Sequence, residues 1–368
     1  MLFNSFLYII FFLPLTLFLF YKAKVNKFYL LIIASLIFYS YYKIEYVFLI
    51  LFIVCINFFF GKILCSKKEK LIKNRNNNFL FSISLNIFIL CVFKYLDFFI
   101  ENINIFLNTN ISYLNIPYPL AISFITFQQI IFLIDCYDDK ISKINFKNYF
   151  LFIVFFPQLI AGPITRFNLI DKQFNKENNF NYNFENLSRG LFLISIGLFK
   201  KVVLSDSLSF FVIPGFDNYQ FLDSLSTWLV SISFTLQFYF DFSAYSDFAL
   251  GTGLLFNIIL PKNFNSPLKS LSIIDFWQRW HMTLTYFLTN YVFMGIAKKF
   301  NKLSFSKSMY SIILTFLIAG IWHGPSWNFV VFGLWHGVCI VINHVFRKFE
   351  IKLNVILSWF LTITTVNV

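Results

Sequence analysis

Length, composition and charge place this chain in a membrane. Of its 368 residues, 58% are hydrophobic, 22% aromatic and only 13% charged, whereas soluble domains are about half apolar and about a quarter charged. The formal net charge of +13 does not indicate nucleic-acid binding, because the lysines gather in short segments between apolar runs, like the cytoplasmic loops of membrane proteins. Long apolar runs satisfy their backbone hydrogen bonds in lipid as helices, so the composition predicts an all-α polytopic membrane protein.

The cysteines give no sign of metal or disulfide chemistry. They are scattered, without the paired spacing of a zinc site or of a disulfide framework, and we expect no bound metal. The five positions are Cys55, Cys65, Cys91, Cys136 and Cys339.

The first third of the chain alternates apolar runs with charged segments. The basic segments Lys22–Lys27 and Lys62–Arg75 fall on the side opposite to the loop Tyr95–Asn115, which contains acidic residues and no Lys or Arg. Cytoplasmic loops carry the excess of basic residues, so this alternation predicts an outside N-terminus. We expect a retained first helix rather than a signal peptide, which would need a basic start and a small-residue cleavage site. The predicted helices are Ser5–Tyr21, Phe28–Tyr42, Tyr46–Gly61, Phe79–Lys94 and Pro117–Cys136.

The next apolar run, Tyr149–Ala161, is short for a membrane span of about 20 residues. It ends in the sequence FPQLIAGPITRF, in which Pro157, Gly162 and Pro163 interrupt a helix. One interpretation is a broken or re-entrant segment that lines a tunnel, since irregular backbone at membrane depth is tolerated where protein or a cavity surrounds it. A loop at the membrane interface fits the same residues.

Two more segments precede the polar motifs. The Asn-rich segment Phe167–Asn186 predicts a surface connection with a short amphipathic helix. Leu187–Leu204 predicts a further helix, ended by Lys200 and Lys201, whose side chains can reach a membrane interface.

Two carboxylates, Asp241 and Asp247, lie inside the long apolar run Thr227–Ile259. Ionisable side chains at membrane depth usually have a partner, and we expect Arg279 or the histidines to provide it. A purely structural ion pair or helix cap is the alternative, because buried acids mostly pair.

Three of the four histidines fall in Asp275–Gly337, beside tryptophans. We predict a helix capped by Asp275 that continues through His281 to Phe293, with positions 277, 281 and 284 on one face. After a basic, cytoplasmic loop, a second helix leads to His323. A helical rise of about 21 to 23 Å on each side brings both rings to similar depth. Intramembrane imidazoles indicate a functional site, whereas two structural histidines packed between tryptophans are the alternative.

Four motifs together carry a family resemblance. They are FPQLIAGPITRF, YFDFSAYSDFALGTGLLF, PKNFNSPLKSLSIIDFWQRWHMTL and GIWHGPSW. In this order they resemble the membrane-bound O-acyltransferase family, in particular its bacterial alginate O-acetylation type and the related peptidoglycan O-acetyltransferases. The resemblance runs from about Phe3 to the C-terminus. It implies a bundle of about 9 to 11 transmembrane or re-entrant helices around a tunnel.

The resemblance also implies an activity, a donor and partners. The expected reaction is transfer of an acetyl group from a cytoplasmic thioester, acetyl-CoA by analogy, for O-acetylation of a cell-envelope or extracellular polysaccharide. A periplasmic SGNH-type transferase is the expected partner, and a bacterial inner membrane the expected location. No GxSxG element marks an internal serine nucleophile.

Residue roles follow from the matched motifs. His323, in the WHG motif, corresponds to the essential histidine of the family, and we expect it to act as the base. His281, in the FWQRWH motif, corresponds to the second important histidine and would position the donor or relay a proton. His336 and His344 receive no role. Supporting or tunnel-lining candidates are Trp322, Trp327, Asp247, Asp241, Arg279 and Trp280.

Several alternatives stay open. The FWQRWHMTL and YVFM segments also resemble D-alanylating relatives, so the acyl group could be D-alanyl. A transporter of an acyl carrier or glycan would use intramembrane Asp and His equally well, and an inactive scaffold is a third possibility. We expect one membrane domain over 1–368, with N-terminal helices in 1–115, the motif-bearing core in 116–346 and an incomplete helix in 354–368, because the chain stops within an apolar run.

Overall fold

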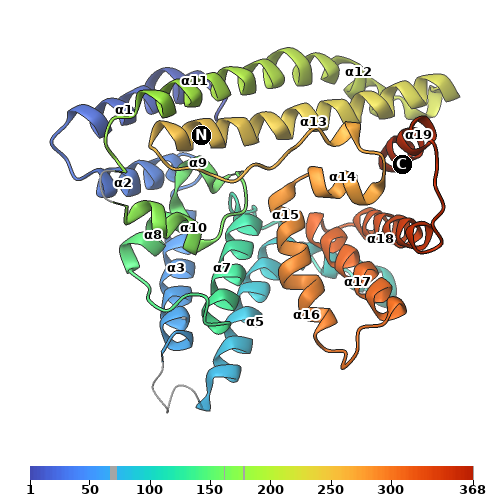
Figure 1. The fold of residues 1–368 in the computed structure, drawn as a ribbon, viewed down its shortest axis with the longest axis horizontal. Coiled ribbons are helices and arrows are strands. Elements are labelled where there is room, and N and C mark those ends of the chain that lie inside the picture. Colours follow the sequence, from blue (N-terminus) through green and yellow to red (C-terminus); the bar gives the residue numbers. More distant parts are fainter. Residues whose placement is uncertain (67–72, 161, 177–178, 368) are drawn as a thin grey trace.

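The computed structural model describes residues 1–66, 73–160, 162–176 and 179–367. These residues form helices joined by turns and loops and contain no β-strand (Figure 1), which confirms the predicted all-α fold. Parts of four predicted segments lie outside the described residues: the middle of Lys62–Arg75, Ala161, residues 177–178 of Phe167–Asn186 and the last residue of 354–368.

The five helices predicted for the first third of the chain are present. A π-helical turn, Leu7–Phe12, continues into the first of them, and the Asn26 side chain caps the second by accepting from the backbone N–H of Phe28 and Tyr29. Their apolar side chains pack into one large core with the middle of the chain. The helices are α1 (Leu13–Lys22), α2 (Lys27–Ser40), α3 (Glu45–Leu64), α5 (Arg75–Lys94) and α7 (Ile122–Tyr137).

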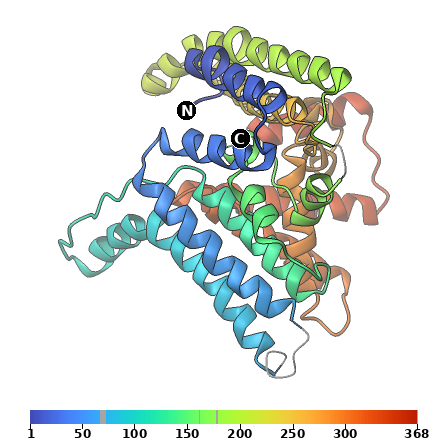
Figure 2. The ribbon, with the colours of Figure 1, turned by 90° about the vertical axis from the view of Figure 1, so that its left-hand side faces the viewer.

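The prediction of a loop over Tyr95–Asn115 is wrong in its first half, where helix α6 (Leu96–Leu107) forms. Asp97 lies in the first turn of this helix, where a negative charge is favourable. Its two carboxylate oxygens accept from the backbone N–H groups of Leu114 (2.9 Å) and Asn115 (3.0 Å). The acidic residue that suggested a loop thus begins a helix and fixes the returning chain. Figure 2 shows α6 and its following loop reaching away from the other helices (teal, left).

The FPQLIAGPITRF segment is broken and buried. Helix α8 (Phe146–Val154) ends at Phe155, and the short helix α9 (Phe156–Leu159) follows at once. Phe155, Phe156 and Leu159 are all at most 2% exposed, and the N–H of Phe156 donates to the Ser35 hydroxyl (3.1 Å). The predicted break is confirmed and is packed inside the protein, whereas its place relative to the membrane and a tunnel-lining role stay predictions.

The short amphipathic helix predicted between Phe167 and Asn186 is α10 (Phe167–Phe174). The predicted end of the next helix at Lys200 and Lys201 is wrong. Helix α11 (Phe184–Leu198) continues through a π-helical segment, Phe199–Ser205, into α12 (Asp206–Asp217). The lysines do not stop the helix because each is paired with a carboxylate.

The partners of those lysines lie on α13 (Ser224–Leu255), which runs alongside α11 and α12 (Figure 1). The Lys200 ammonium lies 2.6 Å from the Asp247 carboxylate, and the Lys201 ammonium lies 2.8 Å from that of Asp241 and 2.9 Å from that of Asp206. Arg279 and the histidines are therefore not the partners of these carboxylates, and that expectation is wrong. The structural alternative, an ion pair between helices, is what the chain forms.

The predicted continuous helix from Asp275 to Phe293 is also wrong. The cap is Ser272, whose hydroxyl accepts from the N–H of Asp275 (3.1 Å), and the helix breaks at Trp280 and His281. The pieces are α14 (Ile273–Arg279), α15 (Met282–Phe287), a π-helical segment (Leu288–Phe293) and α16 (Met294–Ala297). The last helices are α17 (Phe305–His323), α18 (Trp327–Lys348) and α19 (Val355–Asn367).

Among the described residues, four helices, α3, α5, α17 and α18, are long and apolar enough to cross a membrane, and shorter apolar helices accompany them. Large apolar side chains such as Phe48 (71%) and Phe88 (64%) stay exposed, which fits contact with lipid. The chain is thus a multi-pass membrane protein, and the total of about 9 to 11 spanning or re-entrant helices stays a prediction.

Candidate active site

The break between α14 and α15 presents His281. Trp280 is extended, and His281 adopts a left-handed conformation (φ 41°, ψ 55°) before Met282 restarts the helix. For a residue other than glycine this conformation costs about 1 to 2 kcal/mol, so neighbouring contacts must maintain it.

Asn263 provides those contacts from the preceding loop. Its carbonyl accepts from the N–H of Met282 (2.8 Å), and its side-chain oxygen accepts from the N–H (3.2 Å) and hydroxyl (2.8 Å) of Thr283. Asn263 is 1% exposed. The turn that carries His281 is therefore held from inside the protein.

The His281 ring is buried and incompletely hydrogen-bonded. Its side chain is 3% exposed, and its Nε2 has no hydrogen-bond partner among the described residues. Phe242 meets the ring edge-on at a centroid distance of 4.8 Å, and Phe124 lies at 6.4 Å. Because a buried polar atom without a partner is costly and rare, Nε2 is a good candidate for a group that acts on a substrate.

His323 is the last residue of α17. Its ring packs between Trp322 (centroids 4.8 Å apart), Phe332 (5.6 Å) and Phe329 (6.3 Å). A Cβ at Gly324 would overlap the Phe329 ring. The glycine of the WHG motif thus allows Phe329 to close over the end of the helix beside His323.

The structure brings three histidines together. His323 lies within electrostatic range of both His281 and His336. The similar depth predicted for His281 and His323 rested on two continuous helices, and the break at His281 removes that basis. His336 is 3% exposed, and its Nδ1 has no partner among the described residues. Its ring contacts Phe332 (4.5 Å) and Trp277 (5.1 Å) edge-on. We call His281, His323 and His336 the histidine cluster.

Sequence reasoning gave His336 no role, although a signal was available. The residue lies in a second WHG tripeptide, thirteen residues after the first. Helix α18 packs against α17 after a short turn, with Gly333 and Gly337 against Phe316. His336 therefore lies deeper in the helix pair than His323, and Phe332 contacts the rings of both. Asn263 had no comparable signal, because its role depends on a turn that the sequence did not predict.

Of the supporting candidates, only Trp322 adjoins the cluster. It stacks on Phe127 (4.7 Å), meets Phe124 edge-on (6.2 Å), and leaves its indole N–H without a partner among the described residues. Trp280 turns away from His281 to stack on Phe276 (5.5 Å) and Phe238 (5.8 Å).

The remaining candidates are held elsewhere. Arg279 forms a helical i,i+4 ion pair with Asp275 (2.7 Å). Trp327 is 60% exposed and donates its indole N–H to the Asn102 side chain on α6 (3.1 Å). Asp241 and Asp247 pair with the lysines of the α11–α12 helix. Because each has a local partner, none of the four takes part in the histidine cluster.

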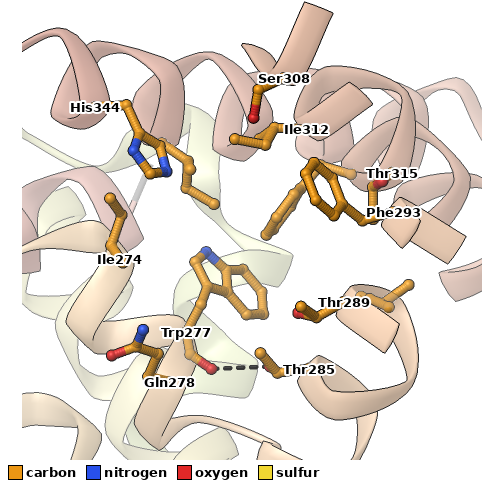
Figure 3. A pocket seen from close by; sticks show the side chains of 13 residues that line it. Ile274, Trp277, Gln278, Thr285, Thr289, Phe293, Ser308, Ile312, Thr315 and His344 are labelled. Carbon is orange, nitrogen blue, oxygen red and sulfur yellow. Dashed lines mark hydrogen bonds between the residues drawn. The ribbon is translucent and has the colours of Figure 1, made fainter. Parts of the chain in front are cut away.

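A cavity of about 300 Å³ lies beside the cluster, between α14–α16 and the pair α17–α18 (Figure 3). Ser308 and His344 line one end, and Trp277, whose ring contacts His336, stands at the centre of the view. The Trp277 indole N–H is buried and has no partner among the described residues, while its carbonyl accepts from the Thr285 hydroxyl (2.8 Å). The walls are otherwise mostly apolar, and His281 and His323 are not among them.

Within the described residues, no group of three or more His, Cys, Asp or Glu side chains is arranged to hold a metal ion. The donors of the cluster are the ring nitrogens, and their surroundings are aromatic. This arrangement suits proton transfer by imidazole in a site from which water is largely excluded.

The fold and this cluster define a helical integral membrane protein with two buried imidazoles and a third, His323, that is partly buried. The chain belongs to MBOAT, the membrane-bound O-acyltransferase family, whose model matches residues 17–368. It is therefore an O-acyltransferase by family.

Similar curated proteins cover most of the chain. A peptidoglycan O-acetyltransferase of Helicobacter pylori is 37% identical in an alignment that covers 92% of this chain and 69% of that protein. A protein of Azotobacter vinelandii named "Probable alginate O-acetylase" is 31% identical over 94% of this chain and 69% of its own length. A teichoic acid D-alanyltransferase of Bacillus subtilis is 28% identical over 63% of this chain and 60% of its own.

Proposed function

We propose that this chain moves an acetyl group from a thioester on the cytoplasmic side of a bacterial inner membrane toward the outside, for O-acetylation of a cell-envelope or extracellular polysaccharide. The names of two similar relatives, a peptidoglycan O-acetyltransferase and an alginate O-acetylase, support the acetyl group and the polysaccharide. Acetyl-CoA is the proposed donor by family analogy.

The observation that carries this proposal is the buried His281 ring, whose Nε2 has no partner among the described residues, within electrostatic range of the partly buried His323. Acyl transfer to a hydroxyl needs a base for the attacking oxygen and donors for the developing oxyanion. His323 takes the proton of the hydroxyl as its oxygen bonds to the acetyl carbon. The carbon–sulfur bond then breaks, and the proton passes to the leaving thiolate. His281 positions the thioester or relays that proton.

The cavity beside Trp277 supports entry of the donor from the cytoplasmic side. Ser308, at one end of it, follows directly on the basic loop of Lys298, Lys299, Lys302 and Lys307, and such loops face the cytoplasm. A narrow, largely apolar space suits the flexible arm of a thioester carrier. The unpartnered Trp277 N–H is available to a carbonyl of that arm.

We further propose that a periplasmic SGNH-type transferase takes the acetyl group from this chain and delivers it to the polymer. The absence of a GxSxG element in the sequence supports such a division of labour, because no internal serine nucleophile is marked. The acceptor hydroxyl at His323 would then belong to that partner or to the polymer itself.

Deleting the gene and restoring it with the wild-type or His323→Ala sequence tests the proposal. Ester-linked acetate is measured on purified peptidoglycan, capsule and exopolysaccharide. We expect acetate to fall on one of these polymers, to return with the wild type and not with His323→Ala at equal membrane abundance. Loss of ester-linked D-alanine instead of acetate, or restoration by His323→Ala, would refute it.

A further inference from the structure

We propose that Lys94 and Tyr95, at the C-terminal end of α5, position His323 by holding the last turn of α17. This inference rests on the proposed function, since it assigns a role to two residues in the same reaction. Neither residue lies in any motif that pointed to the site, and nearly 230 positions of sequence separate them from His323.

The contacts cover three consecutive carbonyl groups. The Tyr95 hydroxyl donates to the carbonyl of Ile321 (2.6 Å). The Lys94 ammonium donates to the carbonyl of Trp322 and to that of His323 (3.1 Å). Both side chains therefore act on the backbone of the residues that carry and flank the imidazole.

These carbonyls need partners from outside their own helix. The last four carbonyls of an α-helix have no intrahelical donor, and Gly324 leaves α17 in an extended conformation (φ −170°, ψ 160°). In an apolar setting an unmet carbonyl is costly, and Tyr95 is only 7% exposed. A cation at a helix C-terminus also complements the helix dipole. Lys94 and Tyr95 thus prevent the last turn of α17 from fraying.

Lys94 also secures a neighbour of the His323 ring. Its ammonium lies 5.4 Å from the centroid of the Trp322 ring. Trp322 in turn stacks on Phe127 and lies 4.8 Å from the His323 ring. One side chain therefore restrains both the backbone of His323 and the indole beside it. A displacement of about 1 Å at a reacting group can lower a rate about 100-fold, so this restraint bears on catalysis.

The chain contains matched controls remote from the cluster. The Lys27 ammonium donates to the carbonyl of Phe180 (2.8 Å) and lies 5.4 Å from the Phe20 ring. The Tyr39 hydroxyl donates to the carbonyl of Leu120 (3.1 Å). Lys27→Met and Tyr39→Phe remove the same chemistry as Lys94→Met and Tyr95→Phe, but away from α17.

The first test measures thiol release from acetyl-CoA in membrane vesicles that retain the partner proteins. We expect Lys94→Met to lower kcat about 100-fold and Tyr95→Phe about tenfold, with KM for acetyl-CoA within about twofold of wild type, as a positioning role requires. Lys94→Arg should regain most of the rate, because it keeps the cation and its donors. Losses equal to those of the two control variants, or a change in KM alone, would overturn the role.

The second test observes His323 without relying on turnover. The chain has four histidines, so ¹⁵N-histidine labelling in nanodiscs gives few resonances, and loss of a signal in His323→Gln assigns that of His323. Lys94→Met and Tyr95→Phe should shift this resonance, and the control variants should not. If Lys94→Met does not fold, the resonance of His323 in Tyr95→Phe tests the positioning role. An unmoved resonance overturns the positioning role, whereas a shifted resonance in a chain inactive with acetyl-CoA counts against the proposed donor alone.

Discussion

The long helix α13 and the broken segment α14–α16 both place ionisable side chains in apolar surroundings, but they do so in opposite ways. On α13, Asp241 and Asp247 each meet a lysine of the α11–α12 helix within 2.8 Å. In α14–α16, His281 sits at a strained turn with Nε2 unpartnered among the described residues. Burial alone therefore does not mark a functional group in this protein. We therefore base the proposed role of His281 on its lack of a partner, at a turn held by other residues, and not on its burial.

The largest effect that would test this contrast is at His281. Asparagine tolerates the left-handed conformation, so His281→Asn should fold like the wild type and lower acetyl transfer at least about 100-fold. The measurement is transfer rate per folded molecule in vesicles, with fluorescence-detected size exclusion as the folding control. If the variant keeps more than a tenth of the wild-type rate, His281 has a structural role and not a catalytic one.

The ion pair of α13 should affect stability instead. Asp247→Leu leaves the Lys200 ammonium unpaired, which we expect to cost about 3 kcal/mol of unfolding free energy. The double variant Lys200→Met with Asp247→Leu should recover most of that loss, because both charges are removed. Thermal unfolding in detergent measures both. The double variant should also transfer acetate at close to the wild-type rate. An inactive double variant would show that Asp247 takes part in acyl transfer.

A smaller effect is expected at Gly324, which closes the end of α17. In Gly324→Ala the new methyl group would meet the Phe329 ring, and we expect the ring to move against His323 and the rate to fall about tenfold. Replacing the Phe329 ring by the smaller side chain of Phe329→Leu, together with Gly324→Ala, should restore part of the transfer rate. An alanine variant as active as wild type would show that Phe329 does not define the His323 environment.

The smallest effect is expected at Arg279, which sequence reasoning placed near the site. Its pair with Asp275 is local and about one third exposed, so Arg279→Gln should cost about 0.5 kcal/mol of stability and leave the transfer rate within about twofold. Equilibrium unfolding and the vesicle assay check the two parts. A large loss of rate would mean that Arg279 contacts a substrate or partner.

Sequence patterns predicted the regular parts of the fold well. The apolar runs that predicted α1, α2, α3, α5 and α7 are long, and each forms a helix. The sequence could not predict α6, because Asp97 suits both a polar loop and the first turn of a helix. It also could not show that Lys200 and Lys201 lie within a continuous helix, since their partners come from a helix distant in sequence.

The candidate site was predicted only in part, because some of its contacts also come from residues distant in sequence. His281 and His323 were found because imidazoles beside tryptophans are unusual in an apolar chain. The turn at His281 was missed, since it depends on Asn263 and on aromatic packing around Trp280. Lys94 and Tyr95 were missed because a lysine at the end of an apolar run is typical of the membrane interface, and the tyrosine after it gave no further signal. Only the fold shows that both reach the end of α17.

The central claim is that His281 and His323 act together in acyl transfer, and a double-variant comparison tests it most directly. Acetyl-transfer rates are measured for His281→Asn, His323→Ala and the combined variant at equal amounts of folded protein. Groups that act as one unit lose their effect together, so we predict that the combined variant is no slower than the slower single variant. Losses that multiply in the combined variant, or a His323→Ala chain that still transfers acetate, would contradict the account.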